Sequence, residues 1–161
     1  EGNLYYAAEA AKAAGVRQMV EPLNTIDTPG VLLTNTQQAI ELIRETGSEN
    51  LYLQYDIYHA QRMEGNITST IARHAGGGGV IKHIQIADSP ARNEPGTGEL
   101  HWPFIFDAID ASGYDGWFVV EAFGLALPSI AAATKIWRRM YDSEEQLARD
   151  ALAFMKKNVE G

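Results

Sequence analysis

The sequence predicts an α/β fold built around a parallel sheet, and two observations lead to that prediction. Short apolar segments alternate with longer segments of helical character along the 161 residues, as strands and crossover helices do in parallel α/β proteins. The composition, 45% apolar and 21% charged, is that of a globular protein long enough to bury one core. We therefore expect residues 1–161 to form a single domain of strand–helix units.

The chain begins with an alanine-rich helix. Residues 2–14 are mostly strong helix formers and end at Gly15, a residue typical of helix C-termini. Residues 16–21 (VRQMVE) follow as a short strand, and a loop containing two prolines comes next. This pair of elements sets the pattern for the rest of the chain.

The second helix has a clear start signal. Asn35 can cap it, because Gln38 follows three residues later, and an apolar stripe then continues up to Gly47. Residues 51–58 (LYLQYDIY) are rich in aromatic and aliphatic residues and predict the second strand.

The same alternation continues to the end of the chain. The predicted elements are a helix over 66–74, a strand over 80–87, a helix over 102–111, a strand over 117–123, and two helices over 128–141 and 143–157. Glycines near 76–79 and at 113 separate them.

A polar side chain stands at or near the carboxyl end of every predicted strand. The four residues are Glu21, Asp56, Gln85 and Glu121. In a parallel sheet these ends share one edge, where α/β folds build their sites. Three carboxylates in a partly dry pocket repel one another unless a cation neutralises them, and oxygen ligands without cysteine favour Mg²⁺ or Mn²⁺. We therefore expect a divalent-metal site.

Two other interpretations of these acidic residues are open. A single acidic residue at a strand end is more often a helix cap or a solvated loop residue, although four at equivalent positions favour a shared site. A flavodoxin-like receiver domain also gathers acids at strand ends, but it places them early in the chain and begins with a strand, which this sequence does not.

Composition excludes several classes of partner. The net charge of −8 argues against nucleic acid, which requires a basic face. No apolar run approaches the ~20 residues of a membrane span and nothing resembles a signal peptide, so we expect no membrane partner and a cytoplasmic location. Without cysteine, disulfides and thiolate metal sites are excluded.

Four segments of the chain closely resemble hydroxypyruvate isomerases of the xylose-isomerase-like TIM-barrel superfamily. They are VEPLN (20–24), QYDIYHAQRMEGNIT (54–68), HIQIADSPARNEPGTGEL (83–100) and GYDGW (113–117). A full barrel has eight βα units, so the resemblance implies that a leading helix and four units form the C-terminal half of a barrel. We expect a fragment of a longer protein whose open sheet edges favour a homo-oligomer or pairing with the missing half.

The resemblance also implies site residues and a reaction. In that family the divalent metal is held at successive strand ends, which correspond here to Glu21, Asp56, Gln85 and Glu121, and His59 and Arg92 reach the substrate. The implied reaction converts hydroxypyruvate to tartronate semialdehyde through an enediolate. Glu21 and Glu121 are the expected proton-transferring residues.

The C-terminal tail leaves the substrate open. Residues 121–157 look more like the related ketose 3-epimerases, which act on sugars such as tagatose or allulose. Those enzymes usually have a histidine as the third ligand, so Gln85 favours the isomerase. A third alternative is an inactive half-barrel scaffold that self-assembles.

Overall fold

A computed structural model describes residues 2–159 of the chain. Its elements are α1 (Gly2–Ala13), β1 (Gln18–Val20), α2 (Thr36–Thr46), β2 (Leu51–Asp56), α3 (Ile57–Met63), α4 (Ile67–His74), β3 (Ile81–Ile86), α5 (Trp102–Ser112), β4 (Trp117–Val120), α6 (Pro128–Ala133) and α7 (Glu144–Val159). Within this range no helix combines the length and the apolar character needed to cross a bilayer. The cytoplasmic location stays a prediction.

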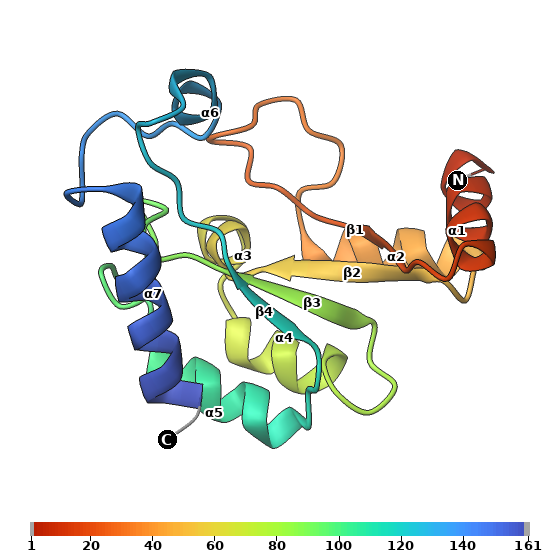
Figure 1. Cartoon of the computed structure of the whole chain (residues 1–161). Coiled ribbons are helices and arrows are strands. Elements are labelled where there is room, and N and C mark those ends of the chain that lie inside the picture. The colour runs from red at the N-terminus through yellow and green to blue at the C-terminus, as the bar shows by residue number, and fades with distance from the viewer. Residues whose placement is uncertain (1, 160–161) are drawn as a thin grey trace.

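The four strands form one parallel sheet in the order β1-β2-β3-β4 (Figure 1). The predicted parallel α/β fold is therefore confirmed. The register pairs Asp56 at the end of β2 with Gln85 in β3. It shifts near the start of this pairing, where Leu53 lies opposite Ile81 but Gln54 lies opposite His83, so that β3 contains one extra residue, Lys82.

The two faces of the sheet differ sharply. Leu53, Ile84 and Ile86 are fully buried in the core cluster, which includes residues of the flanking helices. On the opposite face, Trp117 is 75% exposed and Val119 is 38% exposed. In Figure 1, α4 and α5 lie along the same side of the sheet. One face is thus packed under helices, whereas part of the other is bare in this chain.

Local signals explain why α2 forms where the sequence predicts it. The side chain of Asn35 accepts a hydrogen bond from the backbone N–H of Gln38 at 2.9 Å. Gly47 ends the helix in the left-handed conformation with φ +73°, which glycine adopts without steric cost. In a capping box the side chain of Gln38 would accept from the backbone N–H of Asn35. Here it accepts from the backbone N–H of Thr34, at 3.0 Å.

Two predicted boundaries are wrong near the second and fourth strands. The strand expected over 51–58 ends at Asp56, because the Asp56 carboxylate accepts hydrogen bonds from the next backbone N–H groups and starts α3. The strand expected over 117–123 ends at Val120. The chain therefore reaches the carboxyl edge of the sheet earlier than the apolar pattern indicates.

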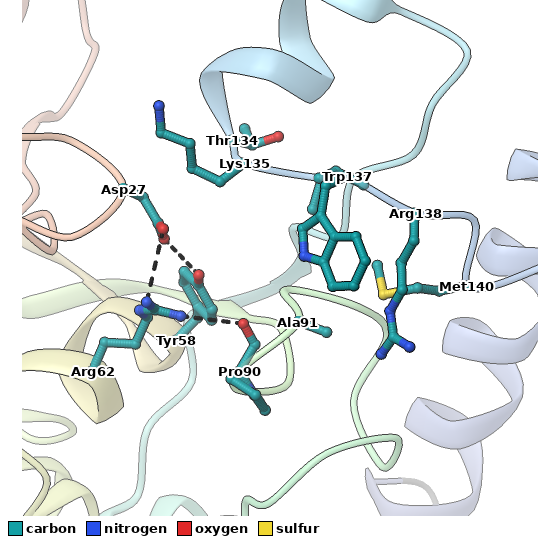
Figure 2. Close-up of a pocket in the computed structure, with 11 residues that line it drawn as sticks. Asp27, Tyr58, Arg62, Pro90, Ala91, Thr134, Lys135, Trp137, Arg138 and Met140 are labelled. Carbon is teal, nitrogen blue, oxygen red and sulfur yellow. Dashed lines mark hydrogen bonds and ion pairs between the residues drawn. The ribbon is translucent and has the colours of Figure 1, made fainter.

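The helix predicted over 128–141 is also wrong beyond its first turns. α6 ends at Ala133, and Lys135 has φ +61°, a conformation that an α-helix cannot continue. The segment 134–140 instead faces Asp27, in the loop after β1, across a cavity of about 300 Å³ that Tyr58 and Arg62 also line (Figure 2). This cavity lies beside the carboxyl edge of the sheet, because Tyr58 follows β2 by two residues.

Candidate active site

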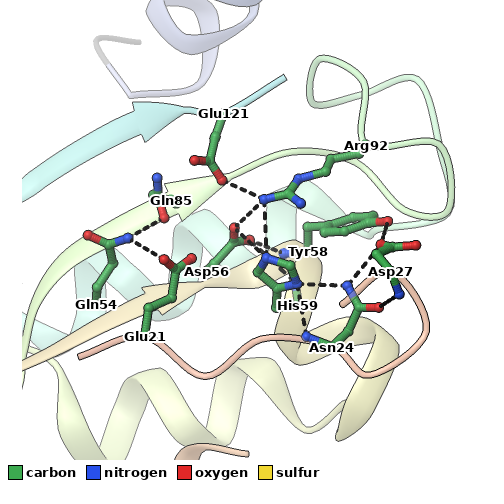
Figure 3. Close-up of polar contacts among 10 residues, drawn as sticks. All are labelled: Glu21, Asn24, Asp27, Gln54, Asp56, Tyr58, His59, Gln85, Arg92 and Glu121. Carbon is green, nitrogen blue, oxygen red and sulfur yellow. Dashed lines mark hydrogen bonds and ion pairs between the residues drawn. The ribbon is translucent and has the colours of Figure 1, made fainter. Parts of the chain in front are cut away.

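The structure brings the predicted strand-end residues together at one edge of the sheet, in two adjacent sets of polar contacts that we call the polar network (Figure 3). Gln54, on β2, links two of them: its Nε2 donates to Glu21 Oε2 at 2.8 Å and to Gln85 Oε1 at 2.6 Å. The backbone N–H of Glu121 donates to the carbonyl of Ile86 at 2.9 Å, which continues the β3–β4 pairing beyond β4. Short, adjacent strand ends therefore hold all the predicted ligands at one edge.

Asp56 occupies the most enclosed position of the network. Its Oδ1 accepts hydrogen bonds from the backbone N–H groups of Tyr58 at 2.8 Å and His59 at 3.3 Å, whereas its buried Oδ2 has no hydrogen-bond partner among the described residues. Burial raises the pKa of Asp56 well above its usual range against the opposing charge of Arg92, and the nearby Glu21 and Glu121 raise it further. A negative charge on Asp56 is therefore costly without a cation.

Glu21 has a similar unsatisfied oxygen. Its Oε1 is buried and, in the part of the chain described, has no hydrogen-bond partner. Burial, followed by repulsion from Glu121, raises the pKa of Glu21 to about 7. Ligand atoms of Glu21, Asp56 and His59 all lie within 4.8 Å of one another. Two unpartnered carboxylate oxygens in a buried cluster fit a hard divalent cation such as Mg²⁺ or Mn²⁺.

Arg92 enters the cluster from the loop after β3. Its Nη2 lies 2.6 Å from Glu121 Oε2 and 3.6 Å from Asp56 Oδ2. The guanidinium carbon is 4.9 Å from the centre of the Tyr58 ring and 4.8 Å from that of the Phe123 ring. Arg92 thus supplies positive charge to the carboxylates, where the sequence resemblance implies a contact with substrate.

A single buried carboxylate holds the loop that carries Arg92. Asp88 is 1% exposed and accepts four hydrogen bonds, which come from the backbone of Ser89 at 3.0 Å, Gly96 at 2.7 Å and Leu100 at 3.2 Å and from the indole of Trp102 at 2.7 Å. Its own backbone carbonyl accepts from the N–H of Arg92 at 2.9 Å. This residue positions the loop rather than adding a ligand.

His59 projects from the first turn of α3 into the network. Its Nδ1 faces two nitrogens of Asn24, the backbone N at 3.1 Å and the side-chain Nδ2 at 2.7 Å. Burial, together with the charge of Arg92, lowers the pKa of His59 to about 3. The imidazole is therefore neutral near pH 7.

Sequence reasoning missed four members of this network: Asn24, Asp27, Gln54 and Tyr58. Asn24 donates through Nδ2 to Asp27 Oδ2 at 2.9 Å, and the Tyr58 hydroxyl donates to the same oxygen at 2.5 Å. Burial raises the pKa of Asp27, but the hydrogen bonds from Tyr58 and Asn24 outweigh this effect, and the net pKa is lowered. The available signal was proximity, because each residue lies within six positions of a predicted ligand.

Comparisons with known proteins show the family of the chain. The model of the xylose isomerase-like TIM barrel family matches residues 2–158. Hydroxypyruvate isomerase of Escherichia coli is 48% identical over 119 residues, which are 74% of this chain and 45% of the relative. A 2-oxo-tetronate isomerase of Cupriavidus necator is 44% identical over the same share of both chains. The chain thus spans about half the length of the curated relatives it matches.

Solved structures place the fold among sugar epimerases as well. A structure of L-ribulose 3-epimerase superposes with a TM-score of 0.87 at 33% identity and covers 98% of this chain and 52% of its own. A protein described as AP endonuclease, family 2, from Brucella melitensis has a TM-score of 0.71 at 37% identity. The match covers 75% of this chain and 46% of that protein's chain. The fold and the family match agree, and the chain belongs to the xylose isomerase-like TIM barrel family, of whose barrel its four-stranded sheet is a part.

Proposed function

We propose that this chain carries the active site of an isomerase that interconverts hydroxypyruvate and tartronate semialdehyde. The observation that carries the proposal is the cluster of Glu21, Asp56, Gln85 and Glu121, with unpartnered oxygens on Asp56 and Glu21. The names of the isomerase relatives support the substrate class.

Glu21, Asp56, Gln85 and Glu121 would together hold Mg²⁺ or Mn²⁺. When bound, such a cation stabilises the negative charge that develops on neighbouring substrate oxygens during enolisation. Gln54 holds the side chains of Glu21 and Gln85 in place through its two hydrogen bonds, and Asp56 is fixed by the first turn of α3.

We assign the proton transfer to Glu21 and Glu121. A carboxylate removes the proton from C3 of hydroxypyruvate, and the electron pair forms the C2–C3 double bond of an enediolate. The proton then returns to C2, and the C3 hydroxyl proton moves to the oxygen on C2, which gives the aldehyde. Glu21 and Glu121 suit this work because they follow the first and last strands of the sheet, so that a carboxylate can stand on either side of the substrate.

Glu121 and Arg92 form the opposite wall of the site. The ion pair between them, at 2.6 Å, fixes the position of the Glu121 carboxylate beside the cluster. We assign Arg92 to the substrate carboxylate as well, because its Nε is buried and has no partner among residues 2–159. The cavity beside Tyr58 also supports an acidic substrate, since its charged lining residues are three basic ones, Arg62, Lys135 and Arg138, and one acidic one, Asp27 (Figure 2).

A ketose 3-epimerase is the second candidate. The observation that favours it is the fit of the L-ribulose 3-epimerase structure to 98% of this chain. Moving a proton off and onto a carbon next to a ketone uses the same pair of carboxylates, so the two activities differ in substrate rather than in machinery.

The deciding experiment completes the barrel. The chain is joined to the part of the E. coli relative that it does not match, and turnover of hydroxypyruvate and of L-ribulose is measured with Mg²⁺, with Mn²⁺ and with a chelator. We expect metal-dependent turnover of hydroxypyruvate, reduced in a Gln85→His variant. Turnover of the ketose alone would replace the isomerase assignment with the epimerase. Unchanged turnover in the chelator would refute the metal assignment.

We also infer that the chain pairs through the open edges and the bare face of its sheet. Trp117 and Val119 are exposed there, and in the described range β1 and β4 are the edges of the sheet. Unpaired edges recruit other strands, so we expect either a homo-oligomer or association with a complementary half barrel. Sedimentation of the isolated chain tests this, and a stable monomer at high concentration would contradict it.

A further inference from the structure

The environment of the His59 imidazole determines which of its nitrogens carries the proton. Asn24 is fully buried and lies against Nδ1 with two nitrogens, its backbone N at 3.1 Å and its side-chain Nδ2 at 2.7 Å. A backbone N–H can only donate, so Nδ1 accepts at least that hydrogen bond and carries no proton.

The orientation of the Asn24 amide is fixed independently of His59. Its Oδ1 accepts a hydrogen bond from the backbone N–H of Asp27 at 2.8 Å, and its Nδ2 donates to Asp27 Oδ2 at 2.9 Å. The reversed amide would place an oxygen against the Asp27 carboxylate and an NH₂ group against a backbone N–H. Asp27 therefore forces Nδ2, a second donor, to face Nδ1 of His59.

We propose that Asn24 is a positioning residue that fixes neutral His59 as the Nε2–H tautomer, so that His59 presents a hydrogen-bond donor to the site and is not a metal ligand. A neutral imidazole has one proton-free nitrogen, and here Asn24 occupies it. A metal ligand would need a lone pair on Nε2, which this tautomer does not have.

On the other side of the ring one contact favours this assignment and one opposes it. Nε2 lies 3.7 Å from the unpartnered Oδ2 of Asp56, an acceptor. Arg92 Nη2 is 3.1 Å from Nε2, but Arg92 already donates to Glu121 at 2.6 Å and needs no acceptor on the ring. Nε2 thus faces one hydrogen-bond donor, from Arg92, whereas Nδ1 faces two, both from Asn24. The two donors at Nδ1 outweigh the one at Nε2 and keep the proton on Nε2.

The role of the His59 tautomer in catalysis rests on the proposed function, whereas the assignment of the tautomer does not. A neutral N–H donor in a buried site stabilises negative charge on a substrate oxygen as it develops. His59 would therefore polarise the substrate, and the proton transfer would remain with the glutamates. His59 lies outside the set of metal ligands, although its nitrogen is close enough to Glu21 and Asp56 to be one.

Nitrogen-15 NMR of the imidazoles tests the tautomer on this chain directly. Long-range proton–nitrogen correlations at pH 7 distinguish the protonated nitrogen, His59→Gln assigns the signals, and the other three histidines act as internal references. We expect Nε2–H for His59 with and without added Mg²⁺. An Nδ1–H tautomer, or loss of the Nε2 proton on adding Mg²⁺, would overturn the proposal without bearing on turnover of hydroxypyruvate.

Two variants test the part played by Asn24. Asn24→Asp replaces the side-chain donor at Nδ1 by an acceptor of nearly the same shape but keeps the backbone N–H that also faces Nδ1, so we expect the population with a proton on Nδ1 to rise without becoming the majority. Asn66→Asp is the matched control, because Asn66 precedes α4 and makes no side-chain cap hydrogen bond; its His59 signals should match the parent chain. An unchanged His59 pattern in folded Asn24→Asp would refute the role of Asn24, and the parent measurement still decides the tautomer if the variant does not fold.

Discussion

Replacing Asp88 by asparagine should destabilise the chain through one specific loss. The Asp88 carboxylate accepts two hydrogen bonds on each oxygen. Asparagine keeps one oxygen and puts an NH₂ group against the two remaining donors, so that two hydrogen bonds to a charged acceptor disappear. Each contributes about 1.5–3 kcal/mol. Because the loop can relax, we expect the lower end of the sum, about 3 kcal/mol of unfolding free energy.

Urea unfolding followed by tryptophan fluorescence measures this change, because Trp102 donates to Asp88. With a slope of about 2 kcal/mol per molar urea, the midpoint should fall by roughly 1.5 M. Asp107→Asn is the matched control, since Asp107 is exposed on α5, and it should leave the midpoint unchanged. A loss below about 0.5 kcal/mol in Asp88→Asn, within the range of surface substitutions, would refute the role of Asp88 as the anchor of the loop.

Three further predictions concern the site and the segment after α6. Burial raises the folded-state pKa of Glu21 from 4.5 to about 7, so the folded state binds the proton more tightly. Stability of the metal-free chain should therefore fall as pH rises from about 4.5 to about 7, and Glu21→Gln should flatten that slope in urea titrations; a rise in stability over this window would contradict the assignment. In the completed barrel Glu121→Gln should lower kcat by about 10²–10⁴ with the fold intact by circular dichroism, and near-normal turnover would remove Glu121 from the proton transfer. Lys135→Gly should raise the unfolding free energy by about 0.5–1 kcal/mol because φ is +61°, and a loss in thermal unfolding would show that the lysine side chain matters more than the strain.

The sequence was sufficient for the order of the elements, except for the unpredicted helix α3, and for the edge at which the candidate site forms. Alternating patterns locate β2 and β3 to within two residues, and the polar residues that close the strands lie together because parallel strands share their carboxyl edge. These features depend on short-range signals such as caps, periodicity and glycine positions, which a single sequence displays.

What could not be predicted depends on a local competition at the end of β2 and on contacts between distant residues elsewhere. The strand expected through Tyr58 stops early, because Ile57 and Tyr58 have high β-propensity and only the capping bonds of Asp56 override it. Asn24 meets His59 across 35 positions of sequence, and no local pattern indicates that contact. Arg92 was expected at the substrate, but its pairing with Glu121 requires the fold of two loops. The roles of these residues in catalysis stay predictions.

The extra residue in β3 decides which side chains become neighbours at the site. With uniform pairing after Leu53 and Ile81, Asp56 would stand beside Ile84, and a carboxylate would face an apolar residue. Lys82 shifts the pairing by one position, so that Asp56 stands beside Gln85. If Lys82 were drawn into a regular ladder, every proposed ligand would remain in the sequence, but the side chains that follow it in β3 would move to opposite faces. The chemistry of this edge thus depends on an irregularity in the main chain, at a residue that contributes no ligand.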